Sequence, residues 1–358
     1  MTRSLAIVAL IFAACSTASA SGVDGVKFTV CPSGCDYTSI QDAIDNSFAP
    51  STIVVKAGTY NENEINTSGL PYTITGEVAS DGTLLTTISG ANLDVDENSS
   101  VFYFNSGETS TTVIQNLIIA DGNAHGYGGG IQVFNCSPTI KSCTITGNSA
   151  LYRNDGSAEN NPSGGGIYLS GSDSLIEDCT ITSNRAQWEG SKDAAGGSGV
   201  ICSDSSPSFV NCLIADNFGY NAGGAYCEYD SEARFYKCVF SGNVGGFYSA
   251  APGALASVSG SNVSLKDCLL CDNAGADPQA PTNILGQWTD LGGNELLTDC
   301  PIPPCIADIN RDGVVNGVDF AYILERWGSD DPLADLNGDG QVDSADLGLA
   351  IADWGSCA

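Results

Sequence analysis

The chain has few positive charges and almost no histidine or methionine. Of its 358 residues, 12 are Lys or Arg, 42 are Asp or Glu, one is His and one is Met, so the formal net charge is −30. Nucleic acids and anionic membranes are bound through Lys- and Arg-rich surfaces, which argues against either as a partner. The acidic balance favours solubility and cation binding instead. A hydrophobic content of 42% indicates a folded chain and not an acidic disordered one.

Long apolar runs are also missing, and the only short one lies at the N-terminus. No segment after residue 20 has the 18 apolar residues of a membrane helix, so no membrane span is expected. Residues 1–20 read as a signal peptide, with an apolar run over 5–14 and a small-residue cleavage site at Ala18-Ser19-Ala20. A lipoprotein signal ending at Cys15 is the alternative interpretation. Either one predicts a secreted or cell-surface protein.

A repeat centred on cysteine fills the middle of the chain. In each copy an apolar residue precedes the Cys by three positions, a second apolar residue follows it by two, and Asn follows it by five. The five copies contain Cys143, Cys179, Cys212, Cys238 and Cys268, with Asn148, Asn184, Asn217, Asn243 and Asn273. A small-residue segment lies upstream of every Cys, and nearly all length variation falls between the Asn and the next small-residue segment.

A constant stretch separated by variable segments is typical of a solenoid whose coils have a fixed circumference. Alternation would place each Cys and the following apolar residue inside, and Asn at a corner could stack into a ladder. A column of free buried thiols is the favoured interpretation of the cysteines, and disulfides between neighbouring coils are the alternative. The variable segments 151–163 and 185–195 would emerge as loops from one edge. A hairpin-built sandwich or propeller fits the repeat length less well.

The repeat resembles those of right-handed parallel β-helix proteins, notably polymorphic outer-membrane adhesin repeats, over residues 110–275. The segments 37–44, 53–55 and 58–62 are similar to the opening of pectinesterase-like β-helices of the pectin-lyase-like fold. The resemblance implies an all-β right-handed parallel β-helix over residues 21–300.

A short helix should close the N-terminal end of this solenoid. Ile40, Ala43, Ile44 and Phe48 have helical spacing on one face. An amphipathic helix of this kind would cover the apolar end of the first coil, as repeat folds require. Cys31 and Cys35 lie nearby and are close enough in sequence for a local disulfide.

Two Asp-rich loops of identical spacing lie near the C-terminus. Positions 1, 3, 5, 9 and 12 carry side-chain oxygens and position 6 is Gly, whereas position 7 would offer its backbone carbonyl. The predicted ligands are Asp308, Asn310, Asp312, Val314, Asn316 and Asp319 in the first loop, and Asp335, Asn337, Asp339, Gln341, Asp343 and Asp346 in the second. Alternate oxygens that converge on one hard cation predict two Ca²⁺ sites.

Each loop is followed by an apolar stripe with helical spacing. The stripes are Phe320, Ile323, Leu324 and Trp327 after the first loop, and Leu347, Ala350, Ile351 and Trp354 after the second. Residues 306–358 thus resemble a type I dockerin, a small α-helical EF-hand-like calcium-binding domain whose loops end in Asp. The resemblance implies a cohesin-like protein or a cell-surface anchor as partner.

The positions after loop residue 9, where this family often sets partner choice, differ between the copies. They are Gly317-Val318 and Ser344-Ala345. Cohesin recognition is therefore less firmly indicated than calcium binding. Residues 301–305 contain three prolines and predict a stiff linker. Cys305 and Cys357 bracket the module and form a proposed second disulfide.

No catalytic set is identified in the sequence. The single histidine, His125, lies in a Gly-rich segment, and the few basic residues of the repeat form no lyase pattern. The first hypothesis is a non-catalytic protein that binds a protein or glycan through the edge loops of its solenoid. The second is a polysaccharide-active enzyme, pectate-lyase-like or pectinesterase-like, or a glycoside hydrolase, that acts on uronic-acid polymers.

Overall fold

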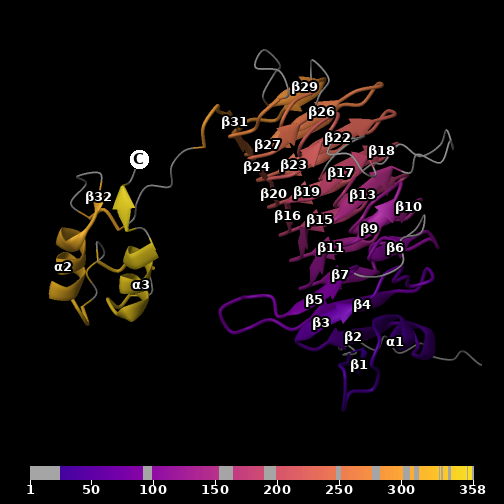
Figure 1. The fold of residues 1–358 in the computed structure, drawn as a ribbon, viewed down its shortest axis with the longest axis horizontal. Coiled ribbons are helices and arrows are strands. Elements are labelled where there is room, and N and C mark those ends of the chain that lie inside the picture. The colour runs from indigo at the N-terminus through magenta and orange to yellow at the C-terminus, as the bar shows by residue number, and fades with distance from the viewer. Residues whose placement is uncertain are drawn as a thin grey trace, which may run out of the picture.

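The computed structural model describes residues 25–91, 99–152, 164–188, 199–246, 251–275, 283–300, 307–309, 314–329, 331, 334–337, 340–352 and 354–356. The signal segment 1–20 and the linker 301–305 lie outside these residues. Over the solenoid, strands stack as parallel ladders, and a separate C-terminal module contains two short helices (Figure 1). In the described residues no helix is long and apolar enough to cross a membrane.

Four parallel sheets, which we name A to D, form the described part of the solenoid. Sheet A contains β1 (Val26–Val30), β2 (Ser51–Val55), β4 (Tyr72–Gly76), β7 (Val113–Gln115), β11 (Thr139–Lys141), β15 (Leu175–Glu177), β19 (Ser208–Val210), β23 (Arg234–Tyr236), β27 (Val263–Lys266) and β30 (Trp288–Asp290). Sheet B contains β3 (Gly58–Asn61), β5 (Thr86–Ser89), β8 (Ile118–Ala120), β12 (Thr144–Thr146), β16 (Thr180–Thr182), β20 (Leu213–Ala215), β24 (Val239–Ser241), β28 (Leu269–Cys271) and β31 (Glu295–Leu296).

Sheets C and D contribute further strands to some of the coils. Sheet C contains β6 (Phe102–Phe104), β10 (Ile131–Phe134), β14 (Ile167–Ser170), β18 (Val200–Ser203), β22 (Ala225–Glu228), β26 (Leu255–Ser257) and β29 (Ile284–Gly286). Sheet D contains β9 (Asn123–His125), β13 (Ser149–Tyr152), β17 (Arg185–Trp188), β21 (Phe218–Gly219) and β25 (Val244–Gly245). The predicted loops at 151–163 and 185–195 therefore begin as strands, because their first residues pair with each other in the ladder of sheet D. Residues 153–163 and 189–198 lie outside the described part.

Single residues with left-handed backbone make the corner between sheets A and B. Asn116, Asp178 and Asn211 have φ values of 57°, 54° and 54°. Asn and Asp tolerate this conformation better than other non-glycine residues. One such residue therefore turns the chain sharply while both flanking strands keep their ladder pairing.

Inward residues of consecutive coils stack like on like. In sheet A the register pairs Ile140 with Ile176, Ile176 with Phe209, and Phe209 with Phe235, and all four are fully buried. Burying a side chain of this size contributes about 1.5–3 kcal/mol. Each coil obtains this burial only from its neighbours, so stacking supplies most of the stability.

The cysteine column and the asparagine ladder predicted from the repeat are both present. Cys143, Cys179, Cys212, Cys238 and Cys268 are buried and form no disulfide. In the ladder, the side-chain amide of each Asn donates to Oδ1 of the Asn in the next coil at 2.9–3.1 Å. The same Oδ1 accepts the backbone N–H of the preceding Asn, so buried turn backbone is satisfied from coil to coil.

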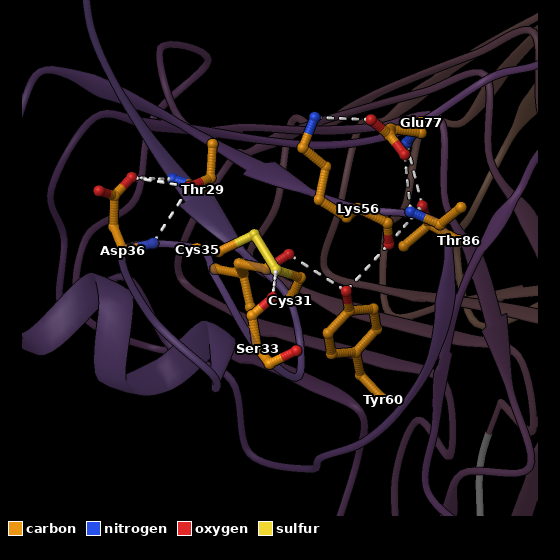
Figure 2. The surroundings of a disulfide bond; sticks show 11 residues. Thr29, Cys31, Ser33, Cys35, Asp36, Lys56, Tyr60, Glu77 and Thr86 are labelled. Carbon is orange, nitrogen blue, oxygen red and sulfur yellow. Dashed lines mark hydrogen bonds and ion pairs between the residues drawn. A yellow bond between two sulfur atoms is a disulfide. The ribbon is translucent and has the colours of Figure 1, made fainter.

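Two disulfides lie toward the two ends of the described solenoid. Cys31 is bonded to Cys35, and Figure 2 shows this disulfide near Tyr60, whose hydroxyl donates to the Val30 carbonyl at 3.1 Å. Cys271 of β28 is bonded to Cys300. This second disulfide ties the last described coils together, and the sequence had left both of its cysteines unassigned.

The N-terminal cap is a helix, as predicted, but it is shorter than its apolar spacing suggested. Helix α1 (Ile40–Asn46) buries Ile40, Ala43 and Ile44. Phe48 lies beyond its end, is 59% exposed and packs edge to face on Phe28. The inclusion of Phe48 in the buried face was therefore wrong, because the helix ends before the chain reaches that position.

The C-terminal module has a small core. Helices α2 (Gly317–Glu325) and α3 (Ser344–Ala352) pack with a two-stranded antiparallel pair, β32 (Val314–Val315) and β33 (Gly355–Ser356). The fully buried apolar residues are Ala307, Val315, Ile323, Ala334, Val342 and Ala350. The predicted apolar stripes are only half correct, since Leu324, Trp327, Ile351 and Trp354 are exposed.

Candidate functional site

The first Asp-rich loop closes on the carboxylate at its position 12. Asp319 lies in the first turn of α2 and is 1% exposed. One of its oxygens accepts the backbone N–H of Ile309, and the other accepts that of Asn316, both at 3.0 Å. Asn316 caps the helix by accepting the N–H of Val318. The end of the loop is thus also a capping box, which explains why Asp fits at position 12.

The second loop repeats this arrangement with a fully buried carboxylate. Asp346 accepts the backbone N–H groups of Leu336, Asn337 and Asp343 at 2.8–3.1 Å. Burial alone would raise the pKa of Asp346, but these three N–H groups outweigh burial and hold the pKa below its usual value. The site therefore keeps a negative charge inside the module.

Position 1 of the second loop is also tied to the loop backbone. Asp335 accepts the N–H of Gly340, the position-6 glycine, at 2.8 Å. Gly340 has φ of 90°, a conformation that a side chain would strain. The glycine thus lets the chain turn around position 1, as the loop pattern requires.

The predicted ligands are only partly within the described residues. Asp308, Val314, Asn316, Asp319, Asp335, Asn337, Gln341, Asp343 and Asp346 are described, whereas Asn310, Asp312 and Asp339 are not. Among the described side chains, no three Asp, Glu, His or Cys residues gather as a metal site. The donor set is nonetheless the hard-oxygen chemistry that Ca²⁺ prefers.

A second group of aromatic residues lies at sheet C, and we call it the aromatic face: Tyr103, Tyr127, Phe134, Tyr168 and Tyr226, of which Tyr168 is only 7% exposed. The Tyr127 and Tyr168 rings lie 4.5 Å apart between centroids, and the Phe134 and Tyr168 rings 5.4 Å apart. Phe134 also contacts the Tyr103 ring edge to face at 6.3 Å. Alignment of the strands that follow each small-residue segment could have revealed part of this face, because Tyr103, Tyr168 and Tyr226 recur at one register position.

One acidic residue borders the aromatic face. Glu228, the last residue of β22, is half-buried, and burial raises the pKa of its carboxyl. Burial also raises the pKa of Tyr168 to about 12, helped by the nearby Tyr127. The pKa of Tyr226 likewise rises to about 12, from burial and the neighbouring Glu228. These phenols therefore stay protonated and can donate hydrogen bonds at any physiological pH.

Several charged residues of the repeat have structural partners. Glu177 pairs with Lys141 at 2.7 Å, and Asp178 accepts from Asn211 at 2.8 Å. His125 lies in β9, and its side chain is outside the described part. A shallow groove of about 670 Å³ beside β1 and β2, which includes Val26, Phe48 and Pro50, has no charged lining residue.

Comparison with known proteins adds matches over both parts of the chain. A family model of the right handed beta helix region matches residues 80–277, and one of the dockerin type I domain matches residues 306–352. No curated protein matches significantly.

Several solved structures are similar at low identity. A pectin methylesterase from Aspergillus niger is 15% identical, with a TM-score of 0.42, over 78% of this chain and 92% of that one. Pectate lyase Pel9A is 12% identical, with a TM-score of 0.43, over 72% of each chain. A rice weevil pectin methyl esterase is 14% identical, with a TM-score of 0.39, over 77% of this chain and 90% of that one.

Proposed function

The chain belongs to the right-handed β-helix family and carries a type I dockerin domain, and from this premise we propose that it is an extracellular binding protein tethered through its C-terminal module. The dockerin would attach the chain to a cohesin-like protein or a cell-surface anchor. The solenoid would then present a binding surface for a protein or glycan. The observation that carries the proposal is the pair of Asp-rich loops, each closed by a buried Asp at position 12.

Calcium is the proposed cofactor, with one ion in each loop. Asp308, Asn310, Asp312, Val314, Asn316 and Asp319 would hold the first ion, and Asp335, Asn337, Asp339, Gln341, Asp343 and Asp346 the second. A bound cation would offset the charge of Asp319 and Asp346, which burial otherwise makes costly. It would also join each loop to the helix that follows it.

Exposed apolar residues on the two helices and directly after them support a partner-binding role for this module. Leu324 and Trp327 are about half exposed, as are Ile351 and Trp354. A small domain gains nothing from apolar side chains left in water, whereas a partner that covers them gains their burial. We propose that a cohesin-like partner covers part of this surface.

A terminal clasp is part of the same proposal. The β32–β33 pair aligns Val314 with Ser356, so the end of the chain returns to the first loop. Cys357 directly follows Ser356, and Cys305 lies just before Ala307. A Cys305–Cys357 disulfide would close the module at this point. Peptide mapping without reductant should recover the linked pair, and two free thiols in the intact mass would refute it.

Export is proposed from residues 1–20 and agrees with a dockerin-bearing β-helix. Ordinary signal cleavage would leave a mature chain that starts at Ser21, whereas a lipoprotein signal would leave a lipidated Cys15. Mass spectrometry of the mature N-terminus distinguishes the two. An unprocessed Met1 on the native protein would contradict export by either route.

Calorimetry on the full chain tests the tether. We expect two Ca²⁺ sites, abolished by the double substitution Asp308→Ala and Asp335→Ala and unaffected by the control Asp299→Ala, an exposed carboxylate outside the loops. Immobilised type I cohesins should then retain the wild-type chain with Ca²⁺ and release it in chelator. No heat of binding from the wild-type chain would refute the calcium assignment, and Ca²⁺ binding without retention by any cohesin would refute the partner.

A further inference from the structure

Sheet C contains a second set of aligned cysteines, apart from the cysteine column. Cys202 of β18 and Cys227 of β22 are register partners on adjacent coils, and both are fully buried. Neighbouring parallel strands lie about 4.8 Å apart, and disulfides join Cα atoms that are about 4.4–6.8 Å apart. The Cys271–Cys300 disulfide of this chain has a Cα–Cα distance of 4.7 Å. The backbone spacing at Cys202 and Cys227 is therefore compatible with a disulfide.

Each cysteine of this pair has one possible partner. In the ladder of sheet C, Leu169 lies on the other side of Cys202, and Ser257 lies on the other side of Cys227. Both cysteines are thiols in the structure, and their side chains hydrogen bond to each other. Within the described part of the chain, no backbone carbonyl accepts a hydrogen bond from either thiol. No backbone acceptor therefore competes for these two sulfur atoms.

The cysteine column differs in both respects. The thiol of Cys179 donates to the Ile140 carbonyl at 3.7 Å and to the Glu177 carbonyl at 3.2 Å. It also has a cysteine neighbour on each side, Cys143 and Cys212. A disulfide from Cys179 would give up the contacts with both carbonyls and would leave one of its neighbours without a partner. The column is therefore built for thiols, whereas the pair on sheet C is not held in that form by the backbone.

We infer that Cys202 and Cys227 form a disulfide in the mature protein, and that this bond staples two neighbouring coils of the solenoid. The inference goes beyond the proposed function, because it concerns a covalent bond inside the solenoid and not a ligand or a tether. Residues 199–246 are described without a gap, so the bond closes a single coil. A one-residue slip of β22 against β18 would turn its core residues outward. The bond would therefore also fix the register at this point.

Formation of this bond requires an oxidant, and the oxidant is a disulfide compound such as oxidised glutathione. The thiolate of one cysteine attacks a sulfur of the oxidant, forms a mixed disulfide and releases one thiol. The thiolate of the other cysteine then attacks the protein sulfur of the mixed disulfide, which closes the Cys202–Cys227 bond and releases a second thiol. In the net reaction, two electrons and two protons pass from the cysteine pair to the oxidant.

The oxidant must act before the core closes. In the folded chain, the hydrogen bond with Cys227 and burial raise the pKa of Cys202 well above its usual value. The thiolate is the reactive form of cysteine, so the folded pair contains almost no reactive species, and its full burial keeps an oxidant away from the sulfur atoms. The bond therefore forms while β22 docks on β18, and the test must supply the oxidant during folding.

Disulfide mapping of the full chain tests this inference. One sample is purified from an oxidising compartment, and another is reduced and refolded with oxidised glutathione. Both are denatured, alkylated at their free thiols and cleaved before aspartate, which places Cys202, Cys212 and Cys227 on three separate peptides. We expect the Cys202 and Cys227 peptides to be linked and Cys212 to be alkylated. Alkylation of both Cys202 and Cys227, or a link from either of them to Cys212, would overturn the inference.

Substitutions measure what the bond contributes to the solenoid. The double substitution Cys202→Ala and Cys227→Ala removes the bond, whereas the matched control Cys179→Ala removes a buried thiol of the column and leaves the bond intact. Thermal unfolding of each oxidised protein is recorded with and without reductant. Reductant should lower the midpoint of the wild type by about 5–10 °C more than that of the double variant, because a closed loop of this size restricts the unfolded chain. The control should behave like the wild type, and equal shifts in all three proteins would contradict a staple.

Discussion

The solenoid and the C-terminal module are both built by repetition, but they use buried polar groups in opposite ways. In the solenoid, apolar ladders stack across many coils, and buried amides satisfy one another in the asparagine ladder. In the module, a few small apolar residues surround two buried carboxylates that accept backbone N–H groups and that we propose also bind calcium. We therefore expect stacking to stabilise the solenoid without a ligand, and the module to gain stability from a bound cation.

Calcium removal should give the largest difference in thermal stability between the solenoid and the C-terminal module. With free Ca²⁺ at about a thousand times its Kd, binding stabilises a domain by about 4 kcal/mol. A module with so small a core should lose its helices in chelator, while the solenoid transition stays in place. Differential scanning calorimetry of the full chain with and without EDTA measures both. If the unfolding transition of the module has the same midpoint temperature with and without EDTA, the module is no more calcium-dependent than the solenoid.

Breaking the asparagine ladder should give the next largest effect and should act on the solenoid alone. Asn217 accepts the backbone N–H of Asn184 at 3.0 Å and donates to the Ile181 carbonyl at 2.9 Å. Asn217→Ala leaves these buried groups unpaired, which should lower the free energy of unfolding by about 3 kcal/mol. Urea unfolding followed by circular dichroism measures the change.

Asn262→Ala is the matched control for this prediction, because its side-chain bond to Thr289 is exposed. We expect that substitution to cost under about 0.5 kcal/mol. Equal losses from both variants would mean that the ladder contributes no more than an ordinary surface amide.

Much of this contrast could be predicted from the sequence. Constant spacing from Cys to Asn fixes which residues stack, so the parallel coils, the thiol column and the ladder all follow from periodicity. The loop spacing likewise gives the predicted ligand positions. What could not be predicted depends on packing between distant residues, namely sheet D and the Cys271–Cys300 bond.

The exposed apolar residues of the C-terminal module show a second limit of prediction from the sequence. Helical spacing places Leu324 and Trp327 on the stripe that contains Ile323, yet only Ile323 is buried. The module is too small to cover a full stripe on each helix, because a domain of this size buries a smaller fraction of its surface. Periodicity predicts a face, but domain size decides how much of that face is covered.

The solenoid also contains a buried carboxylate, which can be compared with the buried carboxylates of the module. Glu108 is 1% exposed and accepts from the Thr67 hydroxyl, the Gly69 and Ser106 N–H groups and the Cys136 thiol. Burial raises its pKa, but the hydrogen bonds outweigh burial and hold the pKa below its usual value. The fold therefore satisfies this charge with its own donors and without a metal.

Glu108→Gln should thus cost the solenoid about 2 kcal/mol at neutral pH, since an amide cannot accept all four bonds. Because the folded pKa is lowered, the contribution of Glu108 is present above its unfolded pKa and is lost as pH falls through the folded pKa. Unfolding free energies measured from neutral to acidic pH should show a smaller decline in the variant than in the wild type. The addition of Ca²⁺ should change the unfolding free energy of the solenoid in neither the wild type nor the variant. A Ca²⁺-dependent difference between them would contradict the conclusion that the fold's own donors satisfy Glu108.

Surface ion pairs should give the smallest effect and should be alike in the two regions. In the module, Arg326 pairs with Asp331 at 3.0 Å and lies over the Tyr322 ring at 3.5 Å, while in the solenoid Lys141 pairs with Glu177 at 2.7 Å. All of these charges reach solvent, so Arg326→Ala and Lys141→Ala should each cost under about 1 kcal/mol. Arg326→Ala should lower the free energy of unfolding more than Lys141→Ala does, because it also removes the contact with the Tyr322 ring.

Salt should separate the two effects. Salt screens only the charge–charge attraction, so the loss caused by Lys141→Ala should fade in 1 M salt while part of the loss caused by Arg326→Ala persists. Thermal unfolding of both variants at low and high salt measures this, and a salt-independent Lys141 effect would point to lost packing of its methylene chain instead.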